Sequence, residues 1–296
     1  MGKTFGSADD HGFAKRICEG IERVRTMFII QVTKRRNGGY FMLKIKEYVK
    51  AESLEQAYEL NQKRTNRIIG GMLWMRMSDA QIQKAIDLSG LGLDQIEETE
   101  DAFILGCMVT LRQMELHEGL NAMCGGLIRK SVEDIVGVQF RNLATVGGSL
   151  VGRFGFSDVL TGLLVLDTYV ELYKGGTIPL AEYANMKRDN DILVHVIIKK
   201  TAGRYAYQAH RNTKTDFPVL AVAASMVDGK VKAAVGARPQ RARLYLADAP
   251  TQEAAEALAA AVVTGSNMRA SAEYRSHLAK VLLKRAFAEI REKEEQ

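Results

Sequence analysis

The chain has 296 residues, of which 47% are hydrophobic and 26% are charged, a composition typical of globular proteins with sizeable cores. No apolar run approaches the roughly 18 residues that a membrane-spanning helix needs, and no N-terminal segment has the apolar stretch of a signal peptide, so we expect a cytoplasmic protein without a membrane span. Residues 1–41 hold +4 of the net charge of +6. The remainder is therefore nearly neutral, and no basic stripe predicts nucleic acid as a partner.

The three cysteines are sparse, and no two of them have C-x-x-C spacing. This pattern argues against a disulfide framework, a zinc site or an iron–sulfur cluster held by this chain alone. We expect Cys18, Cys107 and Cys124 to be reduced and packed as small hydrophobic side chains.

Residues 1–41 lack a sustained apolar period and carry the basic cluster Lys34-Arg35-Arg36. Glycine codons resemble a ribosome-binding sequence, and Gly38-Gly39 stands shortly before Met42. We therefore hypothesise that residues 1–41 are an extension from a start codon placed too early, or a disordered segment. An intact mass of the protein from its native source that includes Met1 or Gly2 would contradict the first reading.

From Met42 the hydrophobic pattern predicts a mixed arrangement of strands and helices. Residues 43–46 alternate as a strand does, and the S-x-x-Q capping box at 53–56 begins a helix. Arg67–Ile69 runs as a short strand into Gly70-Gly71. Further strands are expected at 85–88, 103–106, 169–173 and 192–198, with a second capping box at 110–113, a helix at about 159–166 and a hairpin turn at 175–176.

A second unit is expected to begin at about residue 201. Its predicted strands lie near 205–209, 220–227 and 231–235, and Asp228-Gly229 joins the last two as a hairpin. Two helices follow, at about 252–263 and 272–292, the second with Ser271 as its N-cap. Strands followed by helices predict a separate small α+β domain.

Two glycine pairs, Gly70-Gly71 and Gly147-Gly148, each follow apolar residues. Such a pair can expose consecutive backbone N–H groups to a phosphate, because no side chain blocks a close approach. Taken alone, an isolated Gly-Gly is more often an ordinary turn. Neither pair belongs to a G-x-G-x-x-G or Walker A pattern, so neither a Rossmann nor a P-loop site is predicted.

The surroundings of the second pair resemble a known family. Residues 139–149 read Gln-Phe-Arg-Asn-Leu-Ala-Thr-Val-Gly-Gly-Ser and are followed by Ser157-Asp158 and by the run 163–167. This order resembles the pattern Q-x-R-N-x-A-T-I/V-G-G-N/S, then S-D, of the FAD-binding (medium) subunits of molybdenum hydroxylases of the xanthine dehydrogenase and carbon monoxide dehydrogenase type. Segments 85–88, 105–110, 214–218 and 271–278 are also similar to the family, so the resemblance covers about residues 42–287.

The resemblance implies an α+β fold. A two-lobed PCMH-type FAD-binding domain would occupy residues 42–200, with lobes at about 42–95 and 96–200. A small CO dehydrogenase flavoprotein-like C-terminal domain, an antiparallel sheet plus helices, would occupy residues 201–290. FAD would lie between the lobes, with its pyrophosphate held by main-chain amides of both glycine loops. The matching residues are Ile68, Ile69, Gly70, Gly71, Met72, Leu73 and Trp74 in the first loop, and Thr145, Val146, Gly147, Gly148 and Ser149 in the second.

Single positions outside the loops also match. Asp158 matches the acid that contacts sugar or ribityl hydroxyls of the flavin nucleotide, although the same residue could simply cap a helix that begins at Val159. Leu193 matches a position that packs near the isoalloxazine ring. Ile135 is similar to a further apolar contact, and Gln208 lies near a position where many relatives have lysine.

The first loop departs from the family pattern. Where the family reads G-G-T-D or G-G-x-S, this chain has Met72, Leu73 and Trp74 after the glycines, so the hydroxyl donor and the acid are absent. Losing one hydrogen bond to a charged group costs about 1.5–3 kcal/mol, whereas backbone amides can still bind phosphate. Trp74, the only tryptophan, either packs in the core or stacks near the cofactor.

The resemblance further implies a role in electron relay. A large partner subunit would carry the molybdopterin centre, and two 2Fe–2S clusters on a small partner subunit would pass electrons to FAD on this chain and on to NAD⁺ or another acceptor. No side chain stands out as a catalytic group or metal ligand, so the chain's task would be binding and orienting its cofactor. The alternatives are a flavin-less structural subunit that docks both partners, and a self-sufficient flavin oxidase.

Overall fold

The computed structural model describes residues 33–34 and 40–292. Strands β1 (Thr33–Lys34) and β2 (Tyr40–Phe41) pair antiparallel. Most of residues 1–41 lie outside the described residues, so the idea that this segment is an extension stays a hypothesis. Within the described residues, no helix is both long and apolar enough to cross a membrane.

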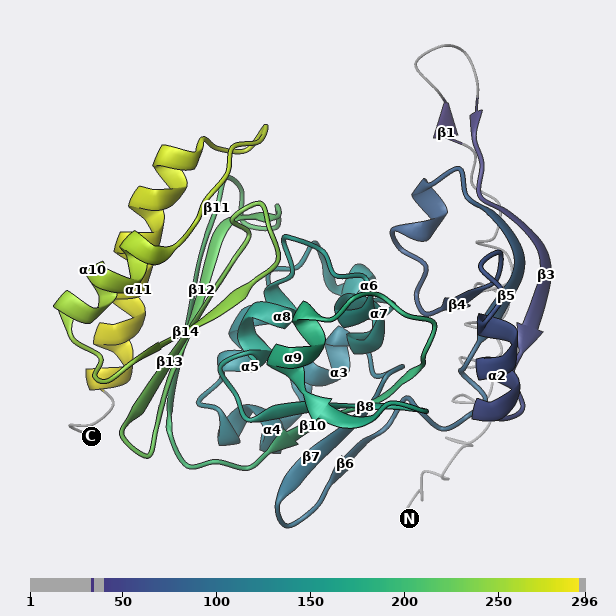
Figure 1. The fold of residues 1–296 in the computed structure, drawn as a ribbon, viewed down its shortest axis with the longest axis horizontal. Helices are drawn as coiled ribbons and strands as arrows, with labels where there is room; N and C mark the ends of the chain where they lie inside the picture. The colour runs from purple at the N-terminus through teal and green to yellow at the C-terminus, as the bar shows by residue number, and fades with distance from the viewer. Residues whose placement is uncertain (1–32, 35–39, 293–296) are drawn as a thin grey trace, which may run out of the picture.

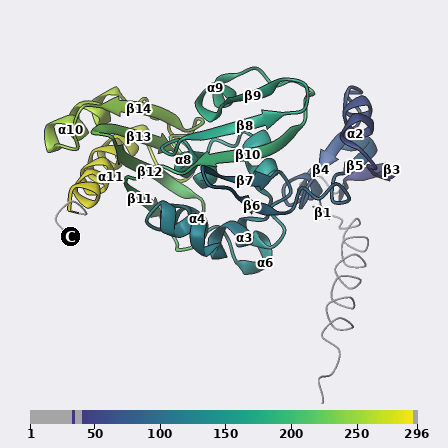
Figure 2. The same cartoon turned by 90° about the horizontal axis from the view of Figure 1, so that it is seen from below.

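Three structural units lie in a row (Figure 1). We call them the first lobe (residues 42–95), the second lobe (96–200) and the C-terminal unit (201–292). The second lobe lies in the middle, and Figure 2 shows α10 and α11 at the end of the molecule opposite to α2 and β3. Each unit has its own sheet, so the predicted α+β architecture is confirmed.

The first lobe is a three-stranded parallel sheet with strand order β3-β5-β4. Its elements are β3 (Lys44–Lys50), α2 (Leu54–Asn61), β4 (Arg67–Ile69), the 3-10 helix η1 (Met75–Met77) and β5 (Gln81–Asp87). Ser53 caps α2 as predicted, but the Gln56 side chain accepts from the Glu52 N–H rather than from the cap. Because β4 ends at Ile69, the Gly70-Gly71 loop leaves the carboxyl end of this sheet.

The second lobe contains an antiparallel sheet with strand order β6-β7-β10-β8-β9. Its strands are β6 (Ile96–Glu98), β7 (Ala102–Gly106), β8 (Thr168–Leu172), β9 (Gly176–Pro179) and β10 (Leu193–Lys199). Its helices are α3 (Leu111–Leu116), α4 (Glu118–Met123), α5 (Leu127–Val132), α6 (Val138–Arg141), α7 (Val146–Val151), α8 (Asp158–Leu163) and α9 (Leu180–Asn185). The capping box predicted at Thr110 is confirmed, with both reciprocal bonds to Gln113 present.

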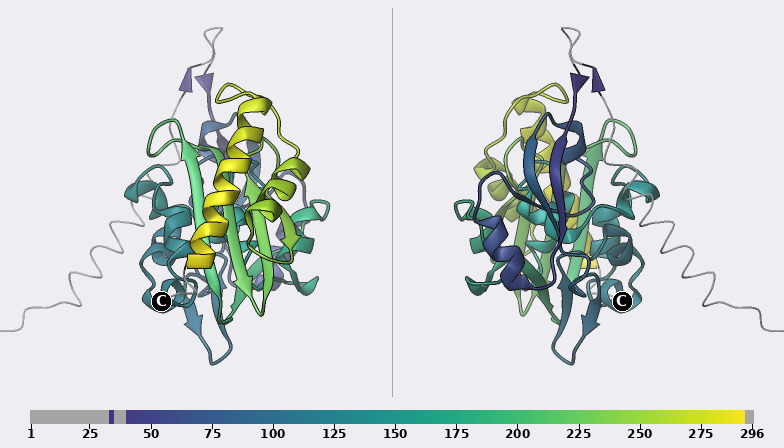
Figure 3. Two further views of the ribbon diagram at one scale, coloured as in Figure 1. Left: turned by 90° about the vertical axis from the view of Figure 1, so that its left-hand side faces the viewer. Right: turned by 90° about the vertical axis from the view of Figure 1, so that its right-hand side faces the viewer.

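The C-terminal unit is a four-stranded antiparallel sheet buried on both faces. Its elements are β11 (Arg204–Arg211), β12 (Pro218–Val227), β13 (Lys230–Gly236), β14 (Arg243–Ala247), α10 (Gln252–Ala261) and α11 (Ala272–Glu292). Helices α10 and α11 cover the outer face (Figure 3), and α5 and α8 of the second lobe pack on the inner face. Alternate residues of β12 accordingly belong to different cores, Ala221 and Ala223 to the inner and Val222 and Ala224 to the outer.

Several element boundaries differ from the sequence-based expectations. The helix expected at 159–166 spans Asp158–Leu163, and strand β14 and the short helices α4 to α7 and α9 were not anticipated. These helices have six residues or fewer, too short for a helical period to show in the sequence. The hairpin at Asp228-Gly229 is confirmed, since both residues have the positive φ of a primed turn.

Candidate functional site

The two predicted glycine loops meet between the first and second lobes. A Cβ added to Gly71 would stand 1.9 Å from the carbonyl oxygen of Leu143, and one on Gly70 would stand 2.8 Å from Thr145 Oγ1. No side chain fits against the Leu143 carbonyl, so glycine is required at position 71, whereas a Cβ at position 70 would have to displace the Thr145 side chain. The fold thus brings the first loop directly against the segment that leads into the second.

The first loop has backbone N–H groups for which the described part of the chain offers no acceptor. In the part of the chain that the structure describes, no acceptor bonds to the N–H groups of residues 70–74. Met72, directly after the glycines, has a φ of 55°, in the left-handed region. Successive backbone N–H groups around a left-handed residue can form a concave nest that binds an anion.

The second loop differs, because its amides already have partners. Thr145 caps α7, and residues 145–147 are buried, whereas Gly148 is exposed and Ser149 is half-buried. The N–H groups of Val146, Gly147, Gly148 and Ser149 bond to Val109 O, Cys107 O, Thr145 Oγ1 and Thr145 O at 2.8, 2.9, 3.1 and 3.0 Å. The second loop therefore supports the first loop by close packing, and the N–H groups without a described acceptor belong to the first loop.

Trp74, at the end of the first loop, lies among phenylalanines. Its ring centroid is 5.9, 6.0, 5.7 and 5.3 Å from those of Phe140, Phe154, Phe156 and Phe217. We call these five residues the Trp74 box. Phe140 belongs to α6, Phe154 and Phe156 to the connection between α7 and α8, and Phe217 to the loop before β12.

Asp158 is buried in the first turn of α8. The helix cap is Ser157, whose Oγ accepts from the Leu160 N–H at 3.1 Å, so the alternative that Asp158 is the cap is wrong. Oδ1 of Asp158 accepts instead from the Tyr207 hydroxyl and from the Arg211 guanidinium, the latter at 2.9 Å. These bonds tie the second lobe to β11 of the C-terminal unit.

Burial controls the titration of this cluster. It raises the pKa of the Asp158 carboxyl, and the neighbouring Arg211 charge offsets only part of the rise. Burial also raises the pKa of the Tyr207 hydroxyl well above its ordinary value, and the adjacent Asp158 adds to the effect. Tyr207 therefore stays protonated and acts as a donor.

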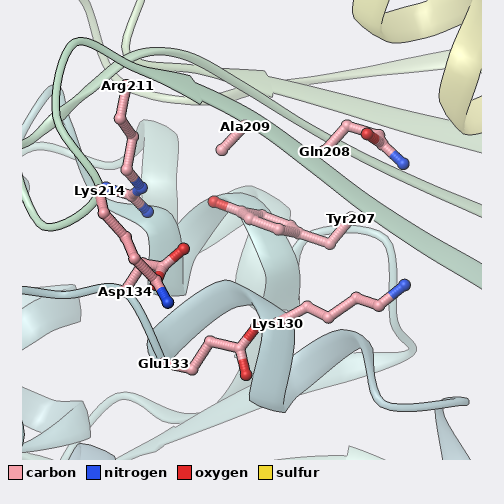
Figure 4. Close-up of a pocket in the computed structure, with 8 residues that line it drawn as sticks. All are labelled: Lys130, Glu133, Asp134, Tyr207, Gln208, Ala209, Arg211 and Lys214. Carbon is pink, nitrogen blue, oxygen red and sulfur yellow. The ribbon is translucent and has the colours of Figure 1, made fainter.

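A cavity of about 450 Å³ lies beside this cluster, between the second lobe and the C-terminal unit (Figure 4). Its lining residues are Lys130, Glu133, Asp134, Tyr207, Gln208, Ala209, Arg211 and Lys214. Gln208, singled out from the sequence, is part of this lining and donates to Glu289 of α11 at 2.8 Å. A volume of this size is in the range of small-molecule sites.

Leu193 and Ile135 lie in the core rather than in the cavity lining. Leu193 begins β10, opposite Leu172, and is 4% exposed. Its neighbour Val194 accepts from the Cys107 N–H, and Cys107 supports Gly147. Ile135 packs against the same core. The expectation that Leu193 packs near the isoalloxazine ring stays a prediction.

A buried ion pair supports the segment that leads into the second loop. Arg141 Nε lies 2.7 Å from Glu115 Oε2, and Arg141 also donates to the Ile135 carbonyl. Burial raises the pKa of Glu115, but the bonds from Arg141 and Arg112 outweigh it and leave the pKa lowered. This pair holds α6 on α3 and so fixes Leu143 against the first loop.

Sequence reasoning missed the partners at the site. The four phenylalanines of the box, Tyr207, Arg211 and Glu115 were not singled out. Phe140, Arg141 and Phe217 did stand in segments that resembled the family, which is the one sequence signal that pointed to them. Their roles depend on contacts between distant segments, which no local pattern encodes. Among the described residues, no group of three or more His, Cys, Asp or Glu side chains could hold a metal.

A two-lobed α+β domain with a glycine loop between the lobes that offers backbone N–H groups suits the binding of a phosphate-containing ligand. Residues 42–201 match the family described as the FAD binding domain in molybdopterin dehydrogenase, and residues 205–290 match the CO dehydrogenase flavoprotein C-terminal domain. The chain therefore belongs to the FAD-binding subunits of the molybdenum hydroxylase family, as its motifs predicted.

Two solved structures share this architecture, and one curated protein is similar in sequence. CO dehydrogenase from Oligotropha carboxidovorans has a TM-score of 0.74 at 22% identity, covering 83% of this chain and 97% of that chain. Quinoline 2-oxidoreductase from Pseudomonas putida 86 has a TM-score of 0.71 at 19% identity, covering 82% and 96%. The protein YgfM of Escherichia coli strain K12 is 24% identical over 257 residues, covering 84% of this chain and 97% of its own length.

Proposed function

We propose that this chain holds FAD between its two lobes and relays electrons from 2Fe–2S clusters of a small partner subunit to NAD⁺ or another acceptor. In the proposed complex, a large partner subunit carries the molybdopterin centre at which substrate is hydroxylated. The observation that carries the proposal is the run of N–H groups at residues 70–74 that have no acceptor among the described residues. It supports a site for a pyrophosphate within a family defined by FAD binding.

The residues present fit this cofactor despite the altered first loop. A pyrophosphate needs donors and positive potential, and five successive amides supply both without side-chain help. Replacing the family's acid with Leu73 also removes a negative charge from the site. Binding would therefore depend on the conformation of the main chain more than it does in relatives.

The remaining groups suit the rest of the nucleotide. Oδ1 of Asp158 is occupied by Tyr207 and Arg211, which leaves Oδ2 as the acceptor for a sugar or ribityl hydroxyl. The cavity between the second lobe and the C-terminal unit is lined by Tyr207 and Arg211, the two residues that bond Asp158, but Asp158 itself is not part of the lining. When bound, FAD supplies the two-electron and one-electron redox chemistry that no side chain here provides. The protein's part is to orient it and to exclude water.

A visible absorption spectrum of the full chain, before and after addition of FAD, tests cofactor binding. We expect flavin bands that survive desalting. Persistent absence of flavin, both in the isolated chain and in the chain assembled with its partner subunits, would contradict the proposal. It would favour the flavin-less structural subunit, the reading to which the altered residues Met72 and Leu73 point.

The acceptor needs a separate measurement. The flavin in the loaded complex is reduced anaerobically, mixed with NAD⁺, and followed by absorbance. Re-oxidation at a rate that matches turnover supports NAD⁺ as the acceptor. A flavin that stays reduced with NAD⁺ but is re-oxidised by an artificial dye would assign another acceptor and leave the electron-relay role intact.

A further inference from the structure

The Trp74 box joins all three units of the molecule. Trp74 comes from the first lobe, three phenylalanines come from the second lobe, and Phe217 comes from the C-terminal unit. The rings also contact one another, with Phe156 and Phe217 at 4.3 Å and Phe154 and Phe156 at 5.2 Å between centroids. The Arg269 guanidinium lies over the Phe217 ring at 4.7 Å. The box is therefore a continuous aromatic contact between the units.

The first loop needs such an anchor. Its amides at residues 70–74 make no hydrogen bond within the described chain, and Met72 adopts a left-handed conformation that disfavours a side chain. At its start, the loop is held by the glycine contacts with Leu143 and Thr145. At its end, it is held by Trp74, which follows the buried Leu73. Between these two anchors, the Met72 carbonyl accepts from the Arg76 N–H at 3.0 Å, but no described acceptor holds the N–H groups of residues 70–74.

The box also connects the loop to the carboxylate at the site. Phe156 stands two residues before Asp158 in the chain. Phe217 follows Asp216, whose carbonyl accepts from the Arg211 guanidinium at 2.8 Å, and the same guanidinium bonds Asp158. One series of contacts thus runs from Trp74 through Phe217 and Arg211 to Asp158. A second route connects Asp158 to Trp74 through Phe156, which is close to Asp158 in the chain and contacts the indole. A shift of the indole would disturb both the amides and the carboxylate.

We propose that Trp74 is a positioning residue for the nucleotide and that Phe217 makes the C-terminal unit part of the nucleotide site. The box holds the first loop in its amide-presenting conformation and replaces the side-chain hydrogen bonds that Met72 and Leu73 cannot make. Bound nucleotide and the packing of the C-terminal unit consequently stabilise each other. The inference rests on the proposed function, because it presumes that the first loop binds the pyrophosphate of FAD.

The first test compares the affinity of four variants of the full chain for FAD. Trp74→Ala and Phe217→Ala should each raise the Kd by about tenfold or more, because the loop then has to be ordered on binding. Trp74→Phe should restore most of the affinity, since it keeps an aromatic ring in the box. Leu282→Ala is the matched control: it removes a side chain of α11 buried in a core cluster that contains none of the box residues, and it should lower stability without changing the Kd.

A spectroscopic test uses the indole itself, which is the only one in the chain. ADP is the probe, because it carries the pyrophosphate of FAD but does not absorb tryptophan emission. We expect saturating ADP to change the intensity or wavelength of Trp74 emission. Phe217→Ala should shift the emission of the free protein toward that of exposed indole, and ADP should partly reverse the shift.

The outcomes distinguish a failure of the proposed function from a failure of the proposed role of the box. Wild-type protein that binds neither FAD nor ADP would contradict the proposed function. If the wild-type protein binds FAD and the Phe217→Ala and Trp74→Ala variants bind it equally tightly, the proposed role of the box is wrong and the proposed function stands. If Trp74→Ala does not fold, the role of the box is tested by comparing the Kd for FAD of Phe217→Ala with that of Leu282→Ala. Equal losses of affinity in those two variants would likewise overturn the inference, because they would reflect general destabilisation.

Discussion

At the scale of single residues, burial determines the chemical state of the groups around the site. The Cys107 thiol, which lies directly behind Gly147, has its pKa raised to about 12 by burial, and burial also raises the pKa of Cys124. Both are free, which confirms the expectation of reduced, hydrophobically packed cysteines for these two. Cys18 lies outside the described residues. Neither buried thiol supplies a nucleophile or a redox group to the site.

The buried carboxyl of Asp158 has Arg211 as its ion-pair partner. Arg211→Met leaves this buried carboxyl without its cation, and we expect a loss of about 3–5 kcal/mol in the free energy of unfolding near neutral pH. Burial already raises the folded-state pKa of Asp158 above that of the unfolded chain. Removing Arg211 raises it further. Since the folded state then binds the extra proton, stability falls as pH rises from the unfolded pKa to the folded one.

Urea unfolding followed by circular dichroism at mildly acidic and at neutral pH measures this effect. The loss caused by Arg211→Met should be smaller at the acidic pH. In the double variant with Asp158→Asn, the pH dependence of that loss should disappear, because no carboxyl remains. An equal loss at both pH values would show that Arg211 acts through packing alone.

At the scale of elements, the site is made where two loops from different lobes touch. The contact is possible because Gly71 has no side chain facing the Leu143 carbonyl. The position of Leu143 is in turn set by α6, which the Glu115–Arg141 pair holds against α3. Neither loop could present the site alone, since the first has the unpaired amides and the second has the rigid backing.

Gly71→Ala tests this contact. The new Cβ would lie 1.9 Å from a backbone oxygen, so the loops must separate, and we expect a stability loss of about 1–3 kcal/mol from overpacking together with a clear loss of FAD affinity. The control is Gly137→Ala, where a Cβ meets nothing closer than Gln139 Oε1 at 3.6 Å. Thermal unfolding and FAD titration of both variants provide the comparison. Unchanged FAD affinity in Gly71→Ala would show that the contact between the loops does not contribute to FAD binding.

At the scale of the whole molecule, the three units are joined with unequal strength. The sheet of the C-terminal unit is enclosed between α10 and α11 on one face and α5 and α8 on the other. The first lobe has a small core cluster of its own, and most residues of β3 are exposed or half-buried. Some of its bonds to the second lobe are also exposed, such as Asn61 to the Asn190 carbonyl and Lys174 to Glu55, and contacts of this kind add little stability.

Hydrogen exchange measured by mass spectrometry should reflect this difference. We expect the amides of β3 and β4 to exchange well before those of β12 and β13, because local opening begins where little apolar surface is buried. FAD should slow exchange at residues 67–77, which include the first loop, and more weakly at residues 214–218 through Phe217. Uniform protection of all three sheets would contradict this picture, as would FAD protection confined to the C-terminal unit.

The sequence by itself determined most of the elements and the family to which the chain belongs. Alternation, capping residues such as Ser53 and Thr110, and the Asp228-Gly229 turn depend on neighbours within a few residues, so local physics specifies them. The motif around Gly147 located the nucleotide-binding domain because it spans many positions in fixed order. The short helices were not predicted, since they carry too few residues for a helical period to appear. Strand β14 was not predicted either, and all its residues are exposed or half-buried.

Tertiary structure alone decided which groups are available to a ligand. Both glycine loops look alike in sequence, yet the amides of residues 146–149 have internal acceptors and those of residues 70–74 have none in the described chain. The partners of Asp158 and Trp74 likewise come from distant segments. A hydrogen bond or ring contact depends on the three-dimensional position of both partners, and spacing along the chain cannot specify that position when the partners lie in different units.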